Sequence, residues 1–348
     1  MHPKFSICIP IRNEAKWLGG AIDSVLAQTD GDFELIIGDN ASDDGIEEVV
    51  AGYDDPRLVH HRFENLVPVN ESFNRTVALA RGEWVITLSA DDRMRPRCTE
   101  VLAGAIGTYA DDHPSMVCGM VRRVDPEGRP DDLGTGDLDP DRPVPYRHFT
   151  PGLNDARSWL MANAAPGLSP WMFGSVALRR QYLAESGFYR IDMELCADFE
   201  LAMRLAVYGP VVWIPEELLD YTVRGASATS GYVTRDLERN RPTTMNERCW
   251  QAVLTLHEER REVDAEERAA IHAAIARQLL QRALWHRTNP SGKGRLASLR
   301  DAARAARYSP STLASPVRLG VLVGSLLAPK VVLDKSREIG HRRGVILP

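Results

Sequence analysis

Acidic side chains stand directly after several apolar segments of this chain. Asp39 follows the apolar run 33–37, and Asp91 with Asp92 follows the run 84–88. Mg²⁺ in proteins is commonly held by one or two carboxylates together with the phosphates of a substrate. The pair Asp91–Asp92 fits that donor set, although two aspartates there could equally cap the helix that follows. The residues therefore point either to a divalent cation site or to a capped helix.

The segments that carry these residues alternate between strand and helix patterns. Strands are expected at 4–11, 33–37, 57–62, 84–88 and 116–124, with helical spacing of apolar residues between them. Pro10 is expected to end the first strand, because proline donates no ladder hydrogen bond. This order predicts an α/β protein with a mostly parallel sheet flanked by helices. Ligands bind beyond the carboxyl ends of such strands, so one crevice should collect these polar groups.

The second half of the chain is less regular. Residues 125–155 are rich in Asp, Gly and Pro and are expected to form a loop, which either lines the site or is a solvated surface. Strands are expected at 171–178, 211–214 and 218–221, and a helix at 198–208. From about residue 240 onward the sequence predicts helices.

Composition narrows the classes of function. The 348 residues include 42 Lys and Arg against 48 Asp and Glu, a net charge of −6. Nucleic-acid binders usually carry a basic excess, so no nucleic-acid partner is expected. The five cysteines are scattered and form no Cys-x-x-Cys pair, which predicts buried, reduced thiols. With no secretory signal recognised near residue 1, a cytoplasmic location is the expectation.

Several motifs together resemble the family 2 glycosyltransferases, which are inverting enzymes with the Rossmann-like GT-A fold. The order and spacing of that family hold over residues 4–95, and a second stretch extends the resemblance to about residue 232. The first set comprises Pro10–Glu14, Ser24–Thr29, Asp39–Asp43, Asn74–Glu83 and Ser89–Asp92. The second comprises Phe173–Gly187, Ala197–Leu201, Arg204–Gly209, Pro215–Glu216 and Tyr221.

The resemblance implies a domain plan. Residues 1–235 would be the catalytic domain, with a nucleotide-sugar half at about 1–124 and an acceptor half at about 156–235. Residues 236–348 would be a helical C-terminal region. The implied reaction moves a sugar from a nucleotide-diphosphate donor to an acceptor hydroxyl with inversion, aided by Mg²⁺ or Mn²⁺. The acceptor would be a glycan, a lipid-linked molecule or a small molecule.

The resemblance also implies the roles of single residues. Asp198 would be the general base, and Asp91 with Asp92 would hold the cation. The donor would be bound by a set of further side chains: Pro10, Arg12, Glu14, Asp39, Asn74, Ser89 and Arg224. Asp39 could instead close an Asx turn, and Asp198 could be a helix N-cap. Glu194 and Glu200 are alternative bases, although Glu200 should point elsewhere from its helix.

Three residues depart from the family pattern. Ser89 stands where many members have the first aspartate of an Asp-x-Asp motif, and Ala197 stands where glutamate often precedes the base. Arg224 lies near the position of a histidine that can ligate metal in other members. A guanidinium suits phosphate, so Arg224 could pair with the diphosphate instead.

Two other functions and one further surface stay open at this point. A nucleotidyltransferase would show a Gly-rich loop with Lys or Arg after the first strand, and PIRNEAKW has none. A non-catalytic nucleotide-sugar-binding subunit is compatible with Ser89 and Ala197. Within the expected tail 316–343, an apolar run of eleven residues is flanked by Lys and Arg. It could lie on the inner face of the membrane as an interfacial helix, or pack on the catalytic domain.

Overall fold

The computed structural model describes residues 2–130, 148–165, 171–224, 245–288 and 294–310. Its contacts divide the chain into two compact units. The first unit is Met1–Asn163 with Gly167–Ser227, and the second is Ala164–Pro166 with Ala228–Pro348. The predicted boundary at residue 235 and the predicted tail 316–343 lie outside the described residues.

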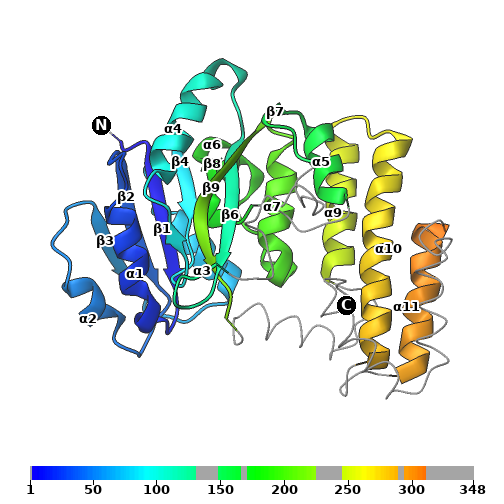
Figure 1. The fold of residues 1–348 in the computed structure, drawn as a ribbon, viewed down its shortest axis with the longest axis horizontal. Helices are drawn as coiled ribbons and strands as arrows, with labels where there is room; N and C mark the ends of the chain where they lie inside the picture. The colour runs from blue at the N-terminus through cyan, green and yellow to red at the C-terminus, as the bar shows by residue number, and fades with distance from the viewer. Residues whose placement is uncertain (1, 131–147, 166–170, 225–244, 289–293, 311–348) are drawn as a thin grey trace. The chain divides into compact units, whose positions relative to one another are not determined.

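The first unit is built on a nine-stranded sheet in the order β3-β2-β1-β4-β8-β6-β9-β5, with β7 paired to β9 (Figure 1). Its first half is parallel throughout and consists of β1 (Phe5–Ile11), β2 (Phe33–Asp39), β3 (Leu58–Arg62) and β4 (Trp84–Thr87). β1 lies between β2 and β4, with Ile11 opposite Asp39 and Cys8 opposite Thr87. Their carboxyl ends therefore meet at one edge of the sheet, as the sequence predicted.

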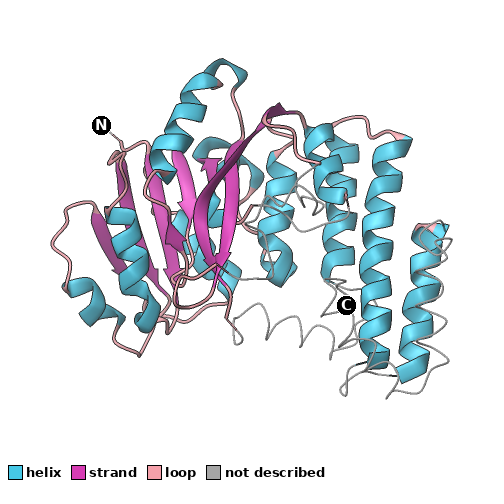
Figure 2. Ribbon diagram, in the orientation of Figure 1, coloured by secondary structure: helices cyan, strands magenta, loops and turns pink. Residues whose placement is uncertain are grey.

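The second half of the sheet mixes directions. β6 (Met116–Val124) runs parallel to β9 (Val211–Thr222), whereas β8 (Val176–Arg179) is antiparallel to both β4 and β6. The short strands β5 (Arg93–Met94) and β7 (Gly152–Asn154) pair antiparallel with β9. This mixed, predominantly parallel sheet flanked by helices is the GT-A fold that the motifs imply (Figure 2).

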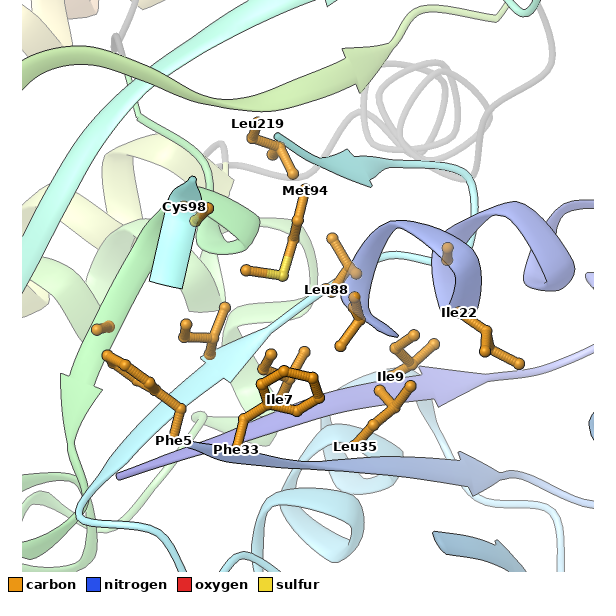
Figure 3. Close-up of a cluster of buried hydrophobic side chains, with 14 of the residues drawn as sticks. Phe5, Ile7, Ile9, Ile22, Phe33, Leu35, Leu88, Met94, Cys98 and Leu219 are labelled. Carbon is orange, nitrogen blue, oxygen red and sulfur yellow. The ribbon is translucent and has the colours of Figure 1, made fainter. Parts of the chain in front are cut away.

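Three helices cover one face of the parallel half. They are α1 (Ala15–Leu26), α2 (Ile46–Ala51) and α4 (Cys98–Thr108). Alternate residues of each strand point to one face, so the odd-numbered residues of β1 and β2 meet these helices in one buried cluster. Figure 3 shows Phe5, Ile7 and Ile9 of β1 beside Phe33 and Leu35 of β2 in that cluster.

On the opposite face lies α3 (Val69–Val77). There Gly38 of β2 contacts α3 so closely that a Cβ on it would overlap Thr76. The remaining helices of the first unit are α5 (Ala156–Ala164), α6 (Arg180–Ser186) and α7 (Ala197–Leu205). All five cysteines of the chain are free and buried, as predicted.

The second unit contains α9 (Met245–Arg260), α10 (Ala265–Thr288) and α11 (Gly294–Tyr308). Its described core is apolar with a buried ion pair, in which Arg282 Nε lies 2.6 Å from Oδ2 of Asp301. The predicted helical C-terminal region is therefore present. Among the residues that the structure describes, no helix is both long and apolar enough to cross a bilayer.

Several local expectations differ from the structure. Pro10 does not end the first strand: it stays paired with Gly38, because the β1–β4 ladder already stops at Cys8 and no donor is needed on that side. The expected strand 171–178 begins only at Val176, after a 3₁₀ turn at Phe173–Ser175. The two strands expected at 211–214 and 218–221 are one strand, β9, which a local register shift against β6 carries past Pro215.

Candidate active site

The segment after β1 is bonded to the loop after β2. Asn13 adopts a left-handed backbone with φ of 52°, a conformation that asparagine tolerates better than most residues. Its N–H donates to Ser42 Oγ at 3.1 Å, and its Oδ1 accepts the N–H of Asp43 at 3.0 Å. The N–H of Ala15 donates to Asp44 Oδ2 at 2.8 Å, which satisfies one free amide at the start of α1. The two strand ends thus form one connected rim.

Asp39 stands at the end of β2 and its side chain is fully buried. Oδ1 accepts the N–H of Ser42 at 2.8 Å, as in an Asx turn, and Oδ2 accepts from Arg62 Nη1 at 3.0 Å. Both oxygens therefore have partners within the protein. Contact between Asp39 and a nucleotide base stays a prediction, and each oxygen has a second lone pair that could accept such a hydrogen bond.

Asp91 and Asp92 are fastened to the end of β9 through Thr222. The Thr222 hydroxyl donates to the backbone oxygen of Asp91 at 2.5 Å, and the Thr222 N–H donates to Asp92 Oδ1 at 2.9 Å. Asp92 is buried, and burial together with the charge of Asp91 raises its pKa well above the usual value. The two neighbouring carboxyls therefore differ: Asp92 is turned into the protein, and Asp91 keeps some exposure.

Arg224 connects Asp91 to the segment after β1. Its Nη1 and Nη2 donate to Glu14 Oε2 and Oε1 at 3.0 and 2.9 Å, and its Nε lies 2.7 Å from Asp91 Oδ2. The guanidinium also lies 5.5 Å from the centre of the Trp17 ring, within cation–π range. A bidentate pair of this kind fixes the guanidinium in orientation as well as position.

Asp198 lies in the first turn of α7, two residues after the N-cap position at Cys196. It is therefore not the N-cap that the sequence left open. Its Oδ1 accepts the N–H of Phe199 at 2.7 Å. The residue as a whole is half-buried, and the loss of water around its carboxyl raises the pKa of that group. Glu200, the alternative base, is buried against Arg204 Nη2 at 2.9 Å and is committed to that ion pair. The side chain of Glu194 lies outside the described residues.

Tyr221 brings the two acidic regions together. Burial raises the pKa of its phenol, and the negative charges of Asp92, Asp91 and Asp198 raise it further. These three carboxyls come from the loop after β4 and from α7, and all three are near enough to the end of β9 to affect Tyr221 electrostatically. The buried Tyr189 hydroxyl lies 2.8 Å from Thr87 Oγ1, and the charge of Asp198 contributes to the raised pKa of Tyr189.

The other predicted donor-binding residues divide into two groups. Pro10 and Arg12 are partly exposed beside the loop after β2, where Arg12 Nη1 lies 3.4 Å from the backbone oxygen of Asn40. Ser89 is exposed at the turn that precedes Asp91. Asn74, in contrast, uses its Nδ2 and Oδ1 to clamp the backbone of Tyr189, both at 2.9 Å. The structure thus gives Asn74 contacts that position the segment before α7.

The described carboxylates do not form a ready-made metal site. No group of three or more His, Cys, Asp or Glu side chains suited to a metal ion occurs in the part of the chain that the structure describes. The carboxylate of Asp91 is already paired with Arg224, and Asp92 accepts from the backbone of Thr222. As arranged, a cation arriving at Asp91 would meet a guanidinium.

Sequence reasoning missed Thr222 and Arg93. Arg93 Nη1 donates to the backbone oxygen of Asp92 at 2.7 Å, and its Nη2 donates to that of Trp17 at 3.2 Å. Gly20 makes this placement feasible, because a Cβ on it would overlap the guanidinium. The only available signal was that Arg93 directly follows the aspartate pair.

The sheet order, the polar carboxyl edge and the flanking helices define a GT-A protein with an acidic site. Residues 6–174 match the sequence model of glycosyl transferase family 2. The predicted resemblance to the family 2 glycosyltransferases is therefore confirmed over this part of the chain.

Relatives of the chain agree with that assignment. A PGL/p-HBAD biosynthesis glycosyltransferase of Mycobacterium tuberculosis is 41% identical over 116 residues, which cover 32% of this chain and 44% of that protein. The abequosyltransferase of Salmonella typhimurium is 29% identical over 131 residues, which cover 35% of this chain and 39% of that protein. The chain therefore spans less than half the length of these curated relatives.

The structure of Staphylococcus aureus TarS residues 1–349 in complex with UDP-GlcNAc is similar in fold. The two chains superpose with a TM-score of 0.52 at 17% identity, over 88% of this chain and 91% of the other. At this level of identity the likeness concerns the fold alone.

Proposed function

We propose that this chain is an inverting glycosyltransferase that moves a sugar from a nucleotide-diphosphate donor to an acceptor hydroxyl. The observation that carries the proposal is the end of β9, where Thr222 bonds both Asp91 and Asp92 and where the charge of Asp198 contributes to the raised pKa of the neighbouring Tyr221. This supports a single site for the aspartates expected on the donor side and the aspartate expected to act as base. The family assignment of residues 6–174 supports the same reaction.

Asp198 is the proposed general base. An acceptor hydroxyl becomes a competent nucleophile only when its proton is removed as it attacks. Burial raises the pKa of Asp198, which makes its carboxylate a stronger base than an exposed aspartate. The carboxylate would take the proton while the hydroxyl attacks the anomeric carbon from the face opposite the departing diphosphate, so the configuration at that carbon inverts.

The donor would occupy the rim formed by the strand ends. Pro10, Arg12 and Asp39 are proposed to contact the nucleoside, and Ser89 and Asp91 the sugar diphosphate. The expectation that Mg²⁺ or Mn²⁺ assists at Asp91 and Asp92 stays a prediction, because these residues do not form a ready-made cation site. A divalent cation, when bound, would act as a Lewis acid that stabilises the departing diphosphate.

The acceptor is proposed to be a hydroxyl-bearing precursor of a glycoconjugate, since the named relatives include a PGL/p-HBAD biosynthesis enzyme. Trp159 and Trp171 are core residues, 1% and 3% exposed, and therefore do not offer a ring face for stacking on a sugar. A cytoplasmic location, with peripheral membrane contact through the tail, stays a proposal.

The experiment is to measure hydrolysis and transfer of UDP-, GDP- and dTDP-sugars by the full chain and by Asp198→Asn. Loss of a general base should lower kcat by about 10²–10⁴-fold. Asp192→Asn is the matched control, because Asp192 is an exposed aspartate in the 3₁₀ segment before α7 and pairs with Arg190. Full activity in Asp198→Asn would place the base elsewhere, and an inactive wild type that still binds nucleotide would favour a non-catalytic binding subunit.

A further inference from the structure

Arg224 lies where a cation would be needed beside Asp91. Its side chain is 18% exposed, and those of Asp91 and Glu14 are 15% and 32% exposed. An ion pair that is mostly removed from water is screened less than a surface pair. The attraction of Glu14 and Asp91 therefore holds the guanidinium in place. Removing one partner would leave a poorly solvated carboxylate behind.

The acidic groups of this region are matched by arginines of the same segments. Glu14 is accompanied by Arg12, the Asp91–Asp92 pair by Arg93, and Glu14 with Asp91 by Arg224. The segments 12–14, 91–93 and 224 therefore carry three arginines and three acidic residues. Arg224 pairs directly with carboxylates, whereas Arg93 donates to backbone oxygens. The arginines of the protein therefore balance the negative charges of these acidic residues.

We propose that Arg224 serves as a built-in cation, so that this chain binds the donor's diphosphate without a divalent metal ion. The proposal rests on the proposed function and deepens it. A guanidinium has five N–H groups. Two of them donate to Glu14, and Nε lies against Asp91. Among the described residues this leaves one N–H on each terminal nitrogen to donate to phosphate oxygens.

The surroundings of Arg224 favour binding of a phosphate there over binding of a metal ion at Asp91. The guanidinium is always protonated, and each N–H that Glu14 and Asp91 leave unused can donate to one phosphate oxygen. Glu14 and Asp91 hold it in orientation, so little conformational entropy is lost when the diphosphate binds. A metal ion would first have to separate Asp91 from Arg224, and it would then lie close to a second positive charge.

The experiment measures binding of UDP, GDP and dTDP to the full chain by calorimetry, once in EDTA and once with Mn²⁺. The wild type should bind at least one of them with the same Kd in both conditions. Arg224→Ala should bind that nucleotide about tenfold to hundredfold more weakly in EDTA. Arg224→Lys should lie between the two, because it keeps the charge and loses the planar fork. Arg97→Ala is the control, since Arg97 is an exposed arginine paired with Glu100.

A second measurement follows Mn²⁺ alone by electron paramagnetic resonance on the nucleotide-free protein. Arg224→Ala should bind Mn²⁺ more tightly than the wild type, because Asp91 and Glu14 lose their internal cation. The inference is overturned if wild-type nucleotide binding requires Mn²⁺, or if wild type and Arg224→Ala bind Mn²⁺ equally. If no nucleoside diphosphate binds the wild type in either condition, the proposed function fails as well, which separates the two outcomes.

Discussion

The carboxyl of Asp198 differs from an ordinary aspartate through its surroundings. It lies in the first turn of α7, and burial raises its pKa against the opposing effect of the Phe199 N–H. A raised pKa in the folded state means that protonation favours folding. The negative charge of Asp198 therefore costs stability at neutral pH, a cost that suits a residue retained for chemistry.

A pH prediction follows for the same residue. The unfolding temperature of Asp198→Asn, measured by calorimetry, should exceed that of the wild type at pH 8, and the difference should shrink as the pH falls through the folded-state pKa of Asp198. In kinetics, kcat/KM of the wild type should fall on the acidic side at a pH above 3.8, the ordinary aspartate value. A difference in unfolding temperature that stays constant from pH 8 to pH 4 would contradict the raised pKa.

At the scale of elements, the end of β9 organises the site. β9 reaches the loop after β4 through Thr222 and the region near α7 through Tyr221, and Arg224 follows two residues later. The register shift between β6 and β9 keeps the strand paired as far as Thr222 despite Pro215. One continuous strand thus holds the loop that carries Asp91 and Asp92 and also lies within electrostatic range of Asp198.

Thr222→Val tests that arrangement, because it removes the hydroxyl and keeps the shape and the backbone N–H. The free energy of unfolding should fall by about 1 kcal/mol for the lost hydrogen bond to Asp91. Nucleotide affinity should fall too, since the loop that carries Asp91 loses one of its two tethers. Thr108→Val is the control, because its hydroxyl bonds only within α4, to Gly104. Unchanged nucleotide affinity in Thr222→Val would show that the loop needs no such tether.

At the scale of the whole molecule, the chain forms two compact units, and every described residue of the candidate site belongs to the first. The second unit has its own means of stabilisation. Arg282 and Asp301 form a buried bidentate pair between α10 and α11, with side chains 3% and 0% exposed. A buried pair stabilises little relative to apolar residues, but removing Arg282 would leave the buried Asp301 with the more distant guanidinium groups of Arg300 and Arg304, at 3.5 and 3.9 Å.

Arg282→Met should therefore lower the free energy of unfolding of the second unit by about 3–5 kcal/mol, and adding Asp301→Leu should recover much of that loss. Calorimetry measures both effects. Nucleotide binding below the unfolding temperature should stay unchanged in Arg282→Met, because the site lies in the first unit. A loss of binding in the folded variant would show that the second unit contributes to the site.

Much of this architecture is readable from local pattern. The alternation of strand and helix, the start of β2 at Phe33 and the turn that carries Asp91 follow from apolar period and from turn residues, which act over a few positions. β2 continues to Asp39, two residues beyond its predicted end. β5 was not predicted, because a two-residue strand has no period. β9 was predicted as two strands, because a proline such as Pro215 normally interrupts a ladder. Its pairing with β6 shows that the strand continues past Pro215.

The sequence by itself determined the α/β class, the family and the aspartates to examine, since these depend on short-range spacing. Only the tertiary structure decided their partners: Arg224 meets Glu14 across 210 positions, and Thr222 meets Asp92 across 130. With 42 lysines and arginines in the chain, no local rule selects which one neutralises a given carboxylate. That choice depends on how the sheet places its strand ends, because electrostatic pairing acts through distance in space and not along the chain.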